Sequence, residues 1–282
     1  MRGRIDSSFF YWHAVMEFKE FEYLMRISFI GAGRVAAHLA SALCKQHQII
    51  QIFSRHLAHA ETLAIQLNAE AISEYSQLNA QVDLVIVAVS DQSIAEVIES
   101  ISPYLQGVLI VHTSGSTNLS VLSQSHEKSG VFYPLQTFSI GRAVDWVNTP
   151  LFVEAVQAED LESLTILANS LSHRVYQYNS EQRLSLHLAA IFACNFSNYC
   201  YDMAKQVVDA KQVDFSLLYP LIVETANKAT QNDPELVQTG PAIRGDHNIL
   251  NMHQQMLNDT DREDLKVVYQ ILSQQILKRH SQ

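Results

Sequence analysis

Two glycines one residue apart, Gly31 and Gly33, follow a short apolar segment and precede a segment in which apolar residues have helical spacing. This pattern predicts a strand that ends at Ile30, a tight turn, and a helix that begins near Arg34. Gly31 permits the turn, Gly33 lets another group approach the backbone, and Ala36 allows the helix to pack close to the strand. In such an arrangement the N-terminus of the helix can receive the pyrophosphate of a dinucleotide.

The end of the next predicted strand indicates which dinucleotide the turn would bind. Folds that bind NAD carry an acidic residue there, about 20 residues after the glycines, to accept hydrogen bonds from the ribose. This chain has Ser54 and Arg55 instead, and a hydroxyl and a guanidinium suit a phosphate. We therefore expect NADP(H), the alternative being that Arg55 is a solvated residue of the next helix. The expected cofactor-binding residues are Gly31, Ala32, Gly33, Arg34, Val35, Ser54, Arg55, Val89 and Ser90.

Predicted strands and helices alternate as far as residue 179. The continuous apolar runs 83–89 and 107–111 have the length of strands buried on both faces of a parallel sheet. Alternation predicts an α/β fold, a Rossmann-like, doubly wound and mainly parallel sheet whose ligands bind at the carboxyl ends of its strands. The expected strands cover residues 26–30, 49–53, 69–72, 83–89, 107–111, 131–135, 151–156 and 175–178, and the expected helices cover 34–40, 56–68, 91–101, 118–127 and 160–172.

From residue 180 onward the pattern becomes entirely helical. Four helical segments are expected, over residues 181–210, 215–230, 247–257 and 261–278. We therefore expect a Rossmann-like domain over residues 25–179 and a second, all-helical domain over residues 180–282. Residues 1–24 are expected to form an extension outside the fold, with Met25 as an alternative start, or else a helix that packs on a partner.

The composition excludes several classes of partner. The chain has 29 acidic and 19 basic residues without a basic cluster, so we expect no nucleic acid partner, because phosphate contacts need concentrated positive charge. The chain has three cysteines without a paired spacing, so we expect neither a disulfide framework nor a zinc site. This indicates a reducing compartment, the cytoplasm. No apolar run approaches the length of a membrane helix. We expect a small-molecule substrate, no metal and no membrane partner.

Polar residues end two of the predicted strands and are candidates for chemistry. His112 could transfer the proton that accompanies a hydride, since imidazole titrates near neutral pH, or could only bond to the backbone. Ser114 could contact a substrate or cap the next turn. Tyr133 and Gln136 could hydrogen-bond a substrate oxygen, although Tyr133 could equally be a packed side chain at the sheet edge.

The long helix carries a polar stripe within an apolar segment. An α-helical wheel places His187, Cys194 and Asn198 on one stripe, with Asn195 alongside. Buried polar side chains need partners, so this stripe is either one wall of an active site or a polar contact between helices, with Cys194 as a small core residue. Arg244 could bind a substrate carboxylate or form a surface ion pair. The expected catalytic residues are His112, Gln136, His187 and Asn195, and the expected substrate-binding residues are Ser114, Tyr133 and Arg244.

Together these motifs resemble a known bacterial family. The resemblance rests on the segments 31–36, 112–115, 133–138, 187–190 with Asn195, and 239–241 with 244–246. It is a resemblance to proteins that pair a Rossmann-like domain with the helical domain of unknown function 2520 and are labelled NADP oxidoreductases. More distantly the chain is similar to pyrroline-5-carboxylate reductases, 6-phosphogluconate and β-hydroxyacid dehydrogenases, and prephenate dehydrogenases. The resemblance implies a homodimer formed by the helical domain and an active site between the domains.

The chain departs from those relatives at two catalytic positions. Where β-hydroxyacid dehydrogenases carry a lysine one turn before the asparagine, this chain has Ile191, and where prephenate dehydrogenases have His-Pro it has Tyr133 and Pro134. We therefore expect an NADP(H)-dependent oxidoreductase that acts on a small anionic C=O or C=N substrate. The alternatives are an NADP(H) sensor or interaction protein without catalysis and, less favoured, a site for another adenine nucleotide.

Overall fold

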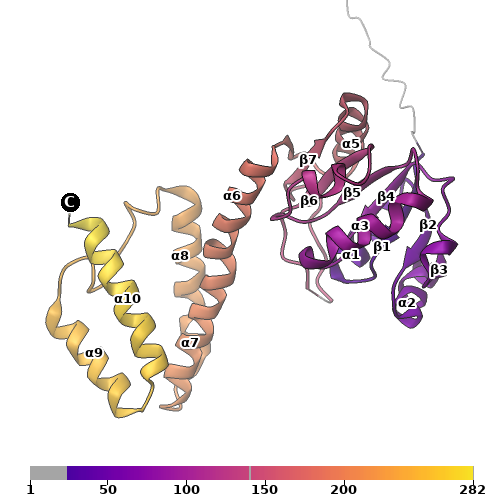
Figure 1. The fold of residues 1–282 in the computed structure, drawn as a ribbon. Coiled ribbons are helices and arrows are strands. Elements are labelled where there is room, and N and C mark those ends of the chain that lie inside the picture. The colour runs from indigo at the N-terminus through magenta and orange to yellow at the C-terminus, as the bar shows by residue number, and fades with distance from the viewer. Residues whose placement is uncertain (1–23, 140, 282) are drawn as a thin grey trace, which may run out of the picture. The chain divides into compact units, whose positions relative to one another are not determined.

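The computed structural model describes residues 24–139 and 141–281, and the chain divides into two compact units. The first unit ends at Ala189 and the second is Ala190–Gln282. Figure 1 shows the strands of the sheet in the first unit and the helices α7 to α10 of the second. The extension predicted over residues 1–24 lies outside the described residues, apart from Leu24.

The first unit contains one eight-stranded sheet with the strand order β3-β2-β1-β4-β5-β6-β7-β8. All neighbouring strands are parallel except β6 and β7, which are antiparallel. The prediction of a Rossmann-like, mainly parallel sheet is therefore confirmed. The strands are β1 Arg26–Ile30, β2 Gln48–Phe53, β3 Glu70–Ile72, β4 Leu84–Val87, β5 Leu109–His112, β6 Ser129–Pro134, β7 Leu151–Ala155 and β8 Val175–Gln177.

The helices of the first unit lie on both faces of this sheet. Alternate strand residues serve two apolar clusters: Phe29 of β1 packs with residues of α1, α2 and α5, whereas Ile30 packs with residues of α3 and α4. Burial on both faces explains why the central strands are continuously apolar. The α-helices are α1 Arg34–Leu43, α2 Leu57–Leu67, α3 Ile94–Ile101, α4 Ser120–Ser123, α5 Ala158–Leu171 and α6 Ser180–Ala190, and the short 3₁₀ helices are Tyr75–Gln77, Asp91–Ser93 and Ser102–Tyr104.

The register of the sheet brings several strand ends to one edge. Ile30 pairs with Phe53 on one side and with Val87 on the other, and Val87 pairs with His112. The strand order reverses direction between β1 and β4, the position at which ligands bind in open α/β sheets. The turns that follow β1, β2, β4, β5 and β6 are the part of this unit in which a site is expected.

The described residues of the second unit form helices and turns. A π-helix over Ile191–Phe196 separates α6 from α7 within the segment in which the sequence predicts one continuous helix. None of the helices within the described ranges has the length and apolar character needed to cross a lipid bilayer. The other helices of this unit are α7 Ser197–Asp209, the 3₁₀ helix Phe215–Leu218, α8 Tyr219–Gln231, α9 His247–Asp259 and α10 Glu263–His280.

Candidate cofactor and catalytic site

The glycine turn after β1 has the geometry that close approach of a ligand requires. Gly31 has φ +114°, and a Cβ added there would lie 2.4 Å from the carbonyl oxygen of Ala88. A Cβ added at Gly33 would have no heavy atom within 4 Å, so the space in front of Gly33 is open. Gly33 is also the N-cap of α1 and brings no side chain to cap its first turn. The free N–H groups and the dipole of α1 therefore face a space that a pyrophosphate could enter.

Backbone hydrogen bonds hold the neighbouring turns against this one. The N–H of Gly31 donates to the carbonyl of Phe53 at 2.9 Å, and the N–H of Ala88 donates to the carbonyl of Ile30 at 2.8 Å. The Cγ1 atom of Val89 lies 3.4 Å from the position of a Cβ at Gly31. The structure thus brings Val89 next to the glycine turn. Ser90, the N-cap of the 3₁₀ turn that follows, exchanges a 2.8 Å hydrogen bond with the hydroxyl of Ser93.

Ser54 and Arg55 follow β2 directly, as predicted, and Arg55 is exposed. The Tyr75 ring stacks on Phe53, the last residue of β2, with centroids 4.5 Å apart. Burial and the charge of Glu96 raise the pKa of Tyr75, whereas the positive charge of Arg55 lowers it. The positive charge of the Arg55 guanidinium therefore lies near the carboxyl end of β2. The residues before and after Arg55 in the chain are not acidic. A glycine cradle, a free helix N-terminus and this hydroxyl and guanidinium fit an NADP molecule.

His112 is the fully buried last residue of β5. Its Nδ1 atom accepts a 3.1 Å hydrogen bond from the N–H of Ser114, whereas its Nε2 atom has no hydrogen-bond partner among the described residues. Burial, and next the positive charge of Arg183, lower the pKa of His112 to about 3. The imidazole is therefore neutral near pH 7 and holds the turn after β5. Ser114 has the capping contacts that the alternative interpretation predicts, because its Oγ atom accepts hydrogen bonds from the N–H groups of Ser116 and Thr117.

Tyr133 and His187 form a polar pair beside that turn. The hydroxyl of Tyr133 lies 3.3 Å from Nδ1 of His187. A Cβ added at Gly115 would lie 2.7 Å from that Nδ1 atom and 2.7 Å from the Cζ atom of Tyr133, so the absence of a side chain at Gly115 lets the pair form. Burial, and next the negative charge of Asp91, raise the pKa of Tyr133 to about 12, against an opposing contribution from Arg183. The phenol therefore keeps its proton at neutral pH.

A buried ion pair fixes the start of α6, which carries His187. The guanidinium of Arg183, with 1% of the residue exposed, pairs with the carboxylate of Glu154 on β7. Its Nε atom donates to the carbonyl of Ser114 at 3.2 Å, and its Nη2 atom donates to the carbonyl of Thr117 and the hydroxyl of Ser180. Arg183 thus joins α6, β7 and the turn after β5, one helical turn before His187.

Other predicted residues are not part of this cluster. Gln136 is exposed and binds Thr149, through a 3.4 Å hydrogen bond from its Nε2 atom, and the backbone of Thr137. Asn195 and Arg244 are exposed and belong to the second unit, so their roles stay predictions. Cys194 is exposed in this chain, and the prediction of a core position is wrong. All residues from Phe192 to Phe196 are exposed, so this part of the helix has no buried face in the described chain.

The sequence interpretation missed Arg183, Glu154, Asp91 and Gly115. The sequence does contain a signal for Arg183 and Glu154. A cation in the first turn of a helix is unfavourable next to the helix dipole, and the carboxylate of Glu154 interrupts the apolar strand β7. Both features indicate a buried partner of opposite charge. Asp91 accepts a hydrogen bond from the hydroxyl of Ser116 and so links the turns after β4 and β5, which no local pattern indicates.

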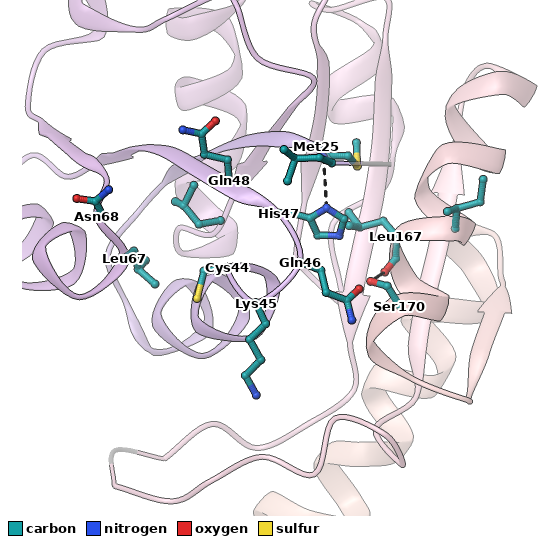
Figure 2. A pocket seen from close by; sticks show the side chains of 13 residues that line it. Met25, Cys44, Lys45, Gln46, His47, Gln48, Leu67, Asn68, Leu167 and Ser170 are labelled. Atoms are coloured by element: carbon teal, nitrogen blue, oxygen red, sulfur yellow. Dashed lines mark hydrogen bonds between the residues drawn. The ribbon is translucent and has the colours of Figure 1, made fainter. Parts of the chain in front are cut away.

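A hollow of about 1010 Å³ lies beside the starts of β1 and β2, away from the carboxyl ends of these strands. Figure 2 shows the side chains that line it. Its lining includes Met25 and Gln48 at the start of strands and Cys44 and Leu67 at the end of helices. The N–H of Met25 donates to Nδ1 of His47 in its wall. Carbonyl groups at helix C-termini disfavour anions. This hollow therefore lacks the features of a pyrophosphate site.

Two family models match separate parts of the chain. Residues 26–115 match a model described as "NADP oxidoreductase coenzyme F420-dependent", and residues 149–276 match the domain of unknown function DUF2520. Among proteins with curated functions, none matches.

Several solved structures are similar along nearly their whole length. A Bacteroides fragilis protein described as a "putative NADP oxidoreductase" is 40% identical, with 90% of this chain and 98% of that chain covered and a TM-score of 0.84. The Thermotoga maritima protein TM1727 is 20% identical, with 90% and 98% covered and a TM-score of 0.68. An imine reductase from Myxococcus stipitatus, solved in complex with NADP⁺, is 15% identical, with 91% and 100% covered and a TM-score of 0.66. The last two show the shared fold.

Proposed function

Because this chain belongs to the family of oxidoreductases that join an NADP domain to a DUF2520 domain, as its motifs predicted, we propose that it transfers a hydride between NADP(H) and a small anionic substrate with a C=O or C=N bond. The observation that carries the proposal is that the open glycine turn follows β1, while Tyr133, paired with His187 of α6, lies at the carboxyl end of β6 in the same mainly parallel sheet. A cofactor turn and a group that can supply a proton are the two parts that reduction of such a bond requires.

NADP is the cofactor of the family, as the sequence predicted. When bound, NADPH supplies the hydride. The proposed contacts to the pyrophosphate come from the turn of Gly31, Ala32, Gly33, Arg34 and Val35. Ser54 and Arg55 are proposed to bind the 2′-phosphate, and Val89 and Ser90 to line the next turn.

Tyr133 and His187 are proposed to deliver the proton to the substrate oxygen or nitrogen. The raised pKa of Tyr133 keeps its hydroxyl protonated, so this hydroxyl can donate a hydrogen bond to the substrate. His187 lies within hydrogen-bond distance of that hydroxyl and can exchange a proton with it. His112, whose pKa of about 3 keeps it a neutral imidazole and not an imidazolium acid at neutral pH, is better suited to holding the turn of Ser114.

Three further residues are proposed to position the substrate. The amide groups of Gln136 and Asn195 can hydrogen-bond its polar atoms, and the guanidinium of Arg244 can bind a carboxylate in two-point contact. Arg244 forms no ion pair within the described part of the chain, which supports the availability of its guanidinium for a substrate.

We also propose a homodimer through the helical unit. Of the large apolar side chains on α7 and α8, many are exposed, whereas the buried apolar residues among the described residues of this unit are Ala242, Leu250 and Leu265. An apolar surface of this kind is typical of a protein interface.

The dimer should appear in light scattering after gel filtration. The variant Leu221→Glu on α8 should shift the protein towards the monomer, whereas Ile65→Glu on α2 should not. A monomeric wild-type protein would contradict this proposal.

Fluorescence titration with NADPH and NADH tests the cofactor, and turnover of imines, 2-oxo acids and β-hydroxy acids tests the reaction. We expect tighter binding of NADPH, and turnover that is lost in His187→Ala while cofactor affinity is kept. Equal affinity for both cofactors would contradict the NADP proposal. Tight NADPH binding without turnover of any of these substrates would favour the sensor interpretation.

A further inference from the structure

Asp91 brings a carboxylate to the turn that lies against the Tyr133–His187 pair. It is the first residue of the 3₁₀ helix after β4, and its Oδ2 atom accepts a hydrogen bond from the hydroxyl of Ser116 in the turn after β5. Ser116 directly follows Gly115 in the chain. A Cβ added at Gly115 would lie 2.8 Å from the hydroxyl oxygen of Tyr133 and 2.7 Å from Nδ1 of His187. The hydrogen bond to Ser116 therefore holds the carboxylate close to the proposed proton donor.

No cation neutralises this carboxylate within the described part of the chain. Asp91 takes part in none of the ion pairs found there, and the buried guanidinium of Arg183 is paired with Glu154. Burial contributes most to the raised pKa of Tyr133, and next comes the negative charge of Asp91, which outweighs the opposing positive charge of Arg183. These side chains thus leave a net negative electrostatic effect at the hydroxyl where we propose that the substrate binds.

A carboxylate at this position has opposite effects on the two kinds of double bond in the proposed substrates. Hydride addition to a C=O bond places negative charge on the oxygen, which hydrogen-bond donors and cations stabilise and a carboxylate does not. A protonated C=N bond is a cation, so a nearby carboxylate stabilises it and raises the pKa of its nitrogen. Protonation also makes the imine carbon a better acceptor of hydride.

We propose that Asp91 is a specificity-determining residue, whose carboxylate favours reduction of a protonated C=N bond over reduction of a C=O bond. This inference rests on the proposed function, of which it names the substrate class. The imine nitrogen receives a proton through the Tyr133–His187 pair, which takes up another from water. Hydride from NADPH then adds to the imine carbon, and the π electrons of the C=N bond become the lone pair of the nitrogen. The products are an amine and NADP⁺.

Steady-state kinetics of the full chain with NADPH test the inference on matched imine and carbonyl substrates. One such pair is 1-pyrroline-2-carboxylate, a cyclic imino acid, and 2-oxopentanoate, the 2-oxo acid with the same number of carbon atoms. The other imines and 2-oxo acids of the substrate screen are measured alongside them. For the wild-type protein we expect a higher kcat/KM with the imines. The ratio of the two kcat/KM values is the readout, because it does not depend on the fraction of active enzyme in a preparation.

The variant Asp91→Asn keeps an oxygen that can accept the hydrogen bond of Ser116 but carries no charge. It should lower the ratio about tenfold, as a decrease of one unit in the pKa of the bound imine would give. NADPH affinity, measured by fluorescence titration, should be kept. The matched control is Asp83→Asn, since Asp83 is also exposed and accepts a 2.7 Å hydrogen bond, from the N–H of Arg26 at the start of β1. This control should keep the wild-type ratio.

A wild-type preference for the 2-oxo acids, or an imine preference that Asp91→Asn leaves unchanged, would overturn the inference while the oxidoreductase proposal stood. Absence of turnover with every imine and carbonyl substrate would instead contradict the proposed function, and the inference with it.

Discussion

The hydroxyl of Tyr133 and Nδ1 of His187 lie 3.3 Å apart, although 54 positions separate the two residues in the chain. Gly115 makes this contact possible, because a methyl group there would lie within 3 Å of both rings. Gly115→Ala should therefore separate the pair. We expect a fall in kcat of about 10- to 100-fold and a loss of about 1–3 kcal/mol in the free energy of unfolding. Steady-state kinetics and urea unfolding measure the two effects, and an unchanged kcat would count against the pair.

Tyr133→Phe removes the hydroxyl and leaves the ring packed beside Phe152. Because the proposed proton comes from this pair, we expect kcat to fall about 100-fold with little change in the affinity for NADPH. His187→Gln should lower kcat similarly and alter the pH profile. A Tyr133→Phe enzyme with wild-type turnover would assign the proton to another group.

The two glycines of the first turn should respond differently to alanine. Gly31→Ala introduces strain at φ +114° and a contact with the Ala88 carbonyl, so we expect a loss of several kcal/mol in the free energy of unfolding. Gly33→Ala meets no protein atom and should leave stability nearly unchanged, while the added methyl group occupies the space of the pyrophosphate and weakens NADPH binding at least tenfold. Thermal unfolding with and without NADPH compares the two, and full NADPH affinity in Gly33→Ala would argue against the proposed cofactor position.

Arg183 and Glu154 should show strong coupling in a double-mutant cycle. Removing one member of a buried ion pair leaves an uncompensated charge, so Arg183→Met or Glu154→Gln should each cost about 3–5 kcal/mol of stability. The double variant Arg183→Met/Glu154→Gln should be less destabilised than the sum of its two single variants. Additive losses would show that the two side chains act separately.

His112 should steepen the acid limb of the stability curve. Its pKa is about 3 in the folded protein and near 6.5 in an unfolded chain, so the unfolded state binds more protons between these values. Stability should therefore fall with decreasing pH, by up to about 1.4 kcal/mol per pH unit from this group. His112→Asn should show a shallower slope in urea unfolding between pH 6 and 4, whereas the exposed His173→Asn should keep the wild-type slope. Equal slopes in wild type and His112→Asn would refute the buried neutral imidazole.

The fold was predictable because a strand that is buried on both faces of the sheet needs an uninterrupted run of apolar residues, which the sequence shows directly. The run Leu84–Val87 is apolar at every position, since alternate residues pack on opposite layers of helices. The glycine turn was predictable for a related reason: a positive φ and an open approach each demand glycine, and both demands occur at Gly31 and Gly33.

The cluster proposed to be catalytic was only partly predictable, since its contacts join residues that are distant in the chain. Tyr133 and His187 were identified separately as candidates, yet no pattern in the sequence places one beside the other. Arg183 was missed because its partners lie on β7 and after β5. The polar stripe on the long helix depended on α-helical geometry, which the π-helix at Ile191–Phe196 interrupts.

The buried contacts of Arg183 determine where a chimaera with a related protein can be joined when the helical domain is exchanged. A change of partner domain made before Ser180 would separate Glu154 and the turn after β5 from the guanidinium of Arg183, to which both are bonded. A junction after Ala189, where the first compact unit ends, would keep the contacts of Arg183, and His187 with them, in one part. Helix α6, which leads into the all-helical unit, therefore belongs by its contacts to the sheet unit that precedes it.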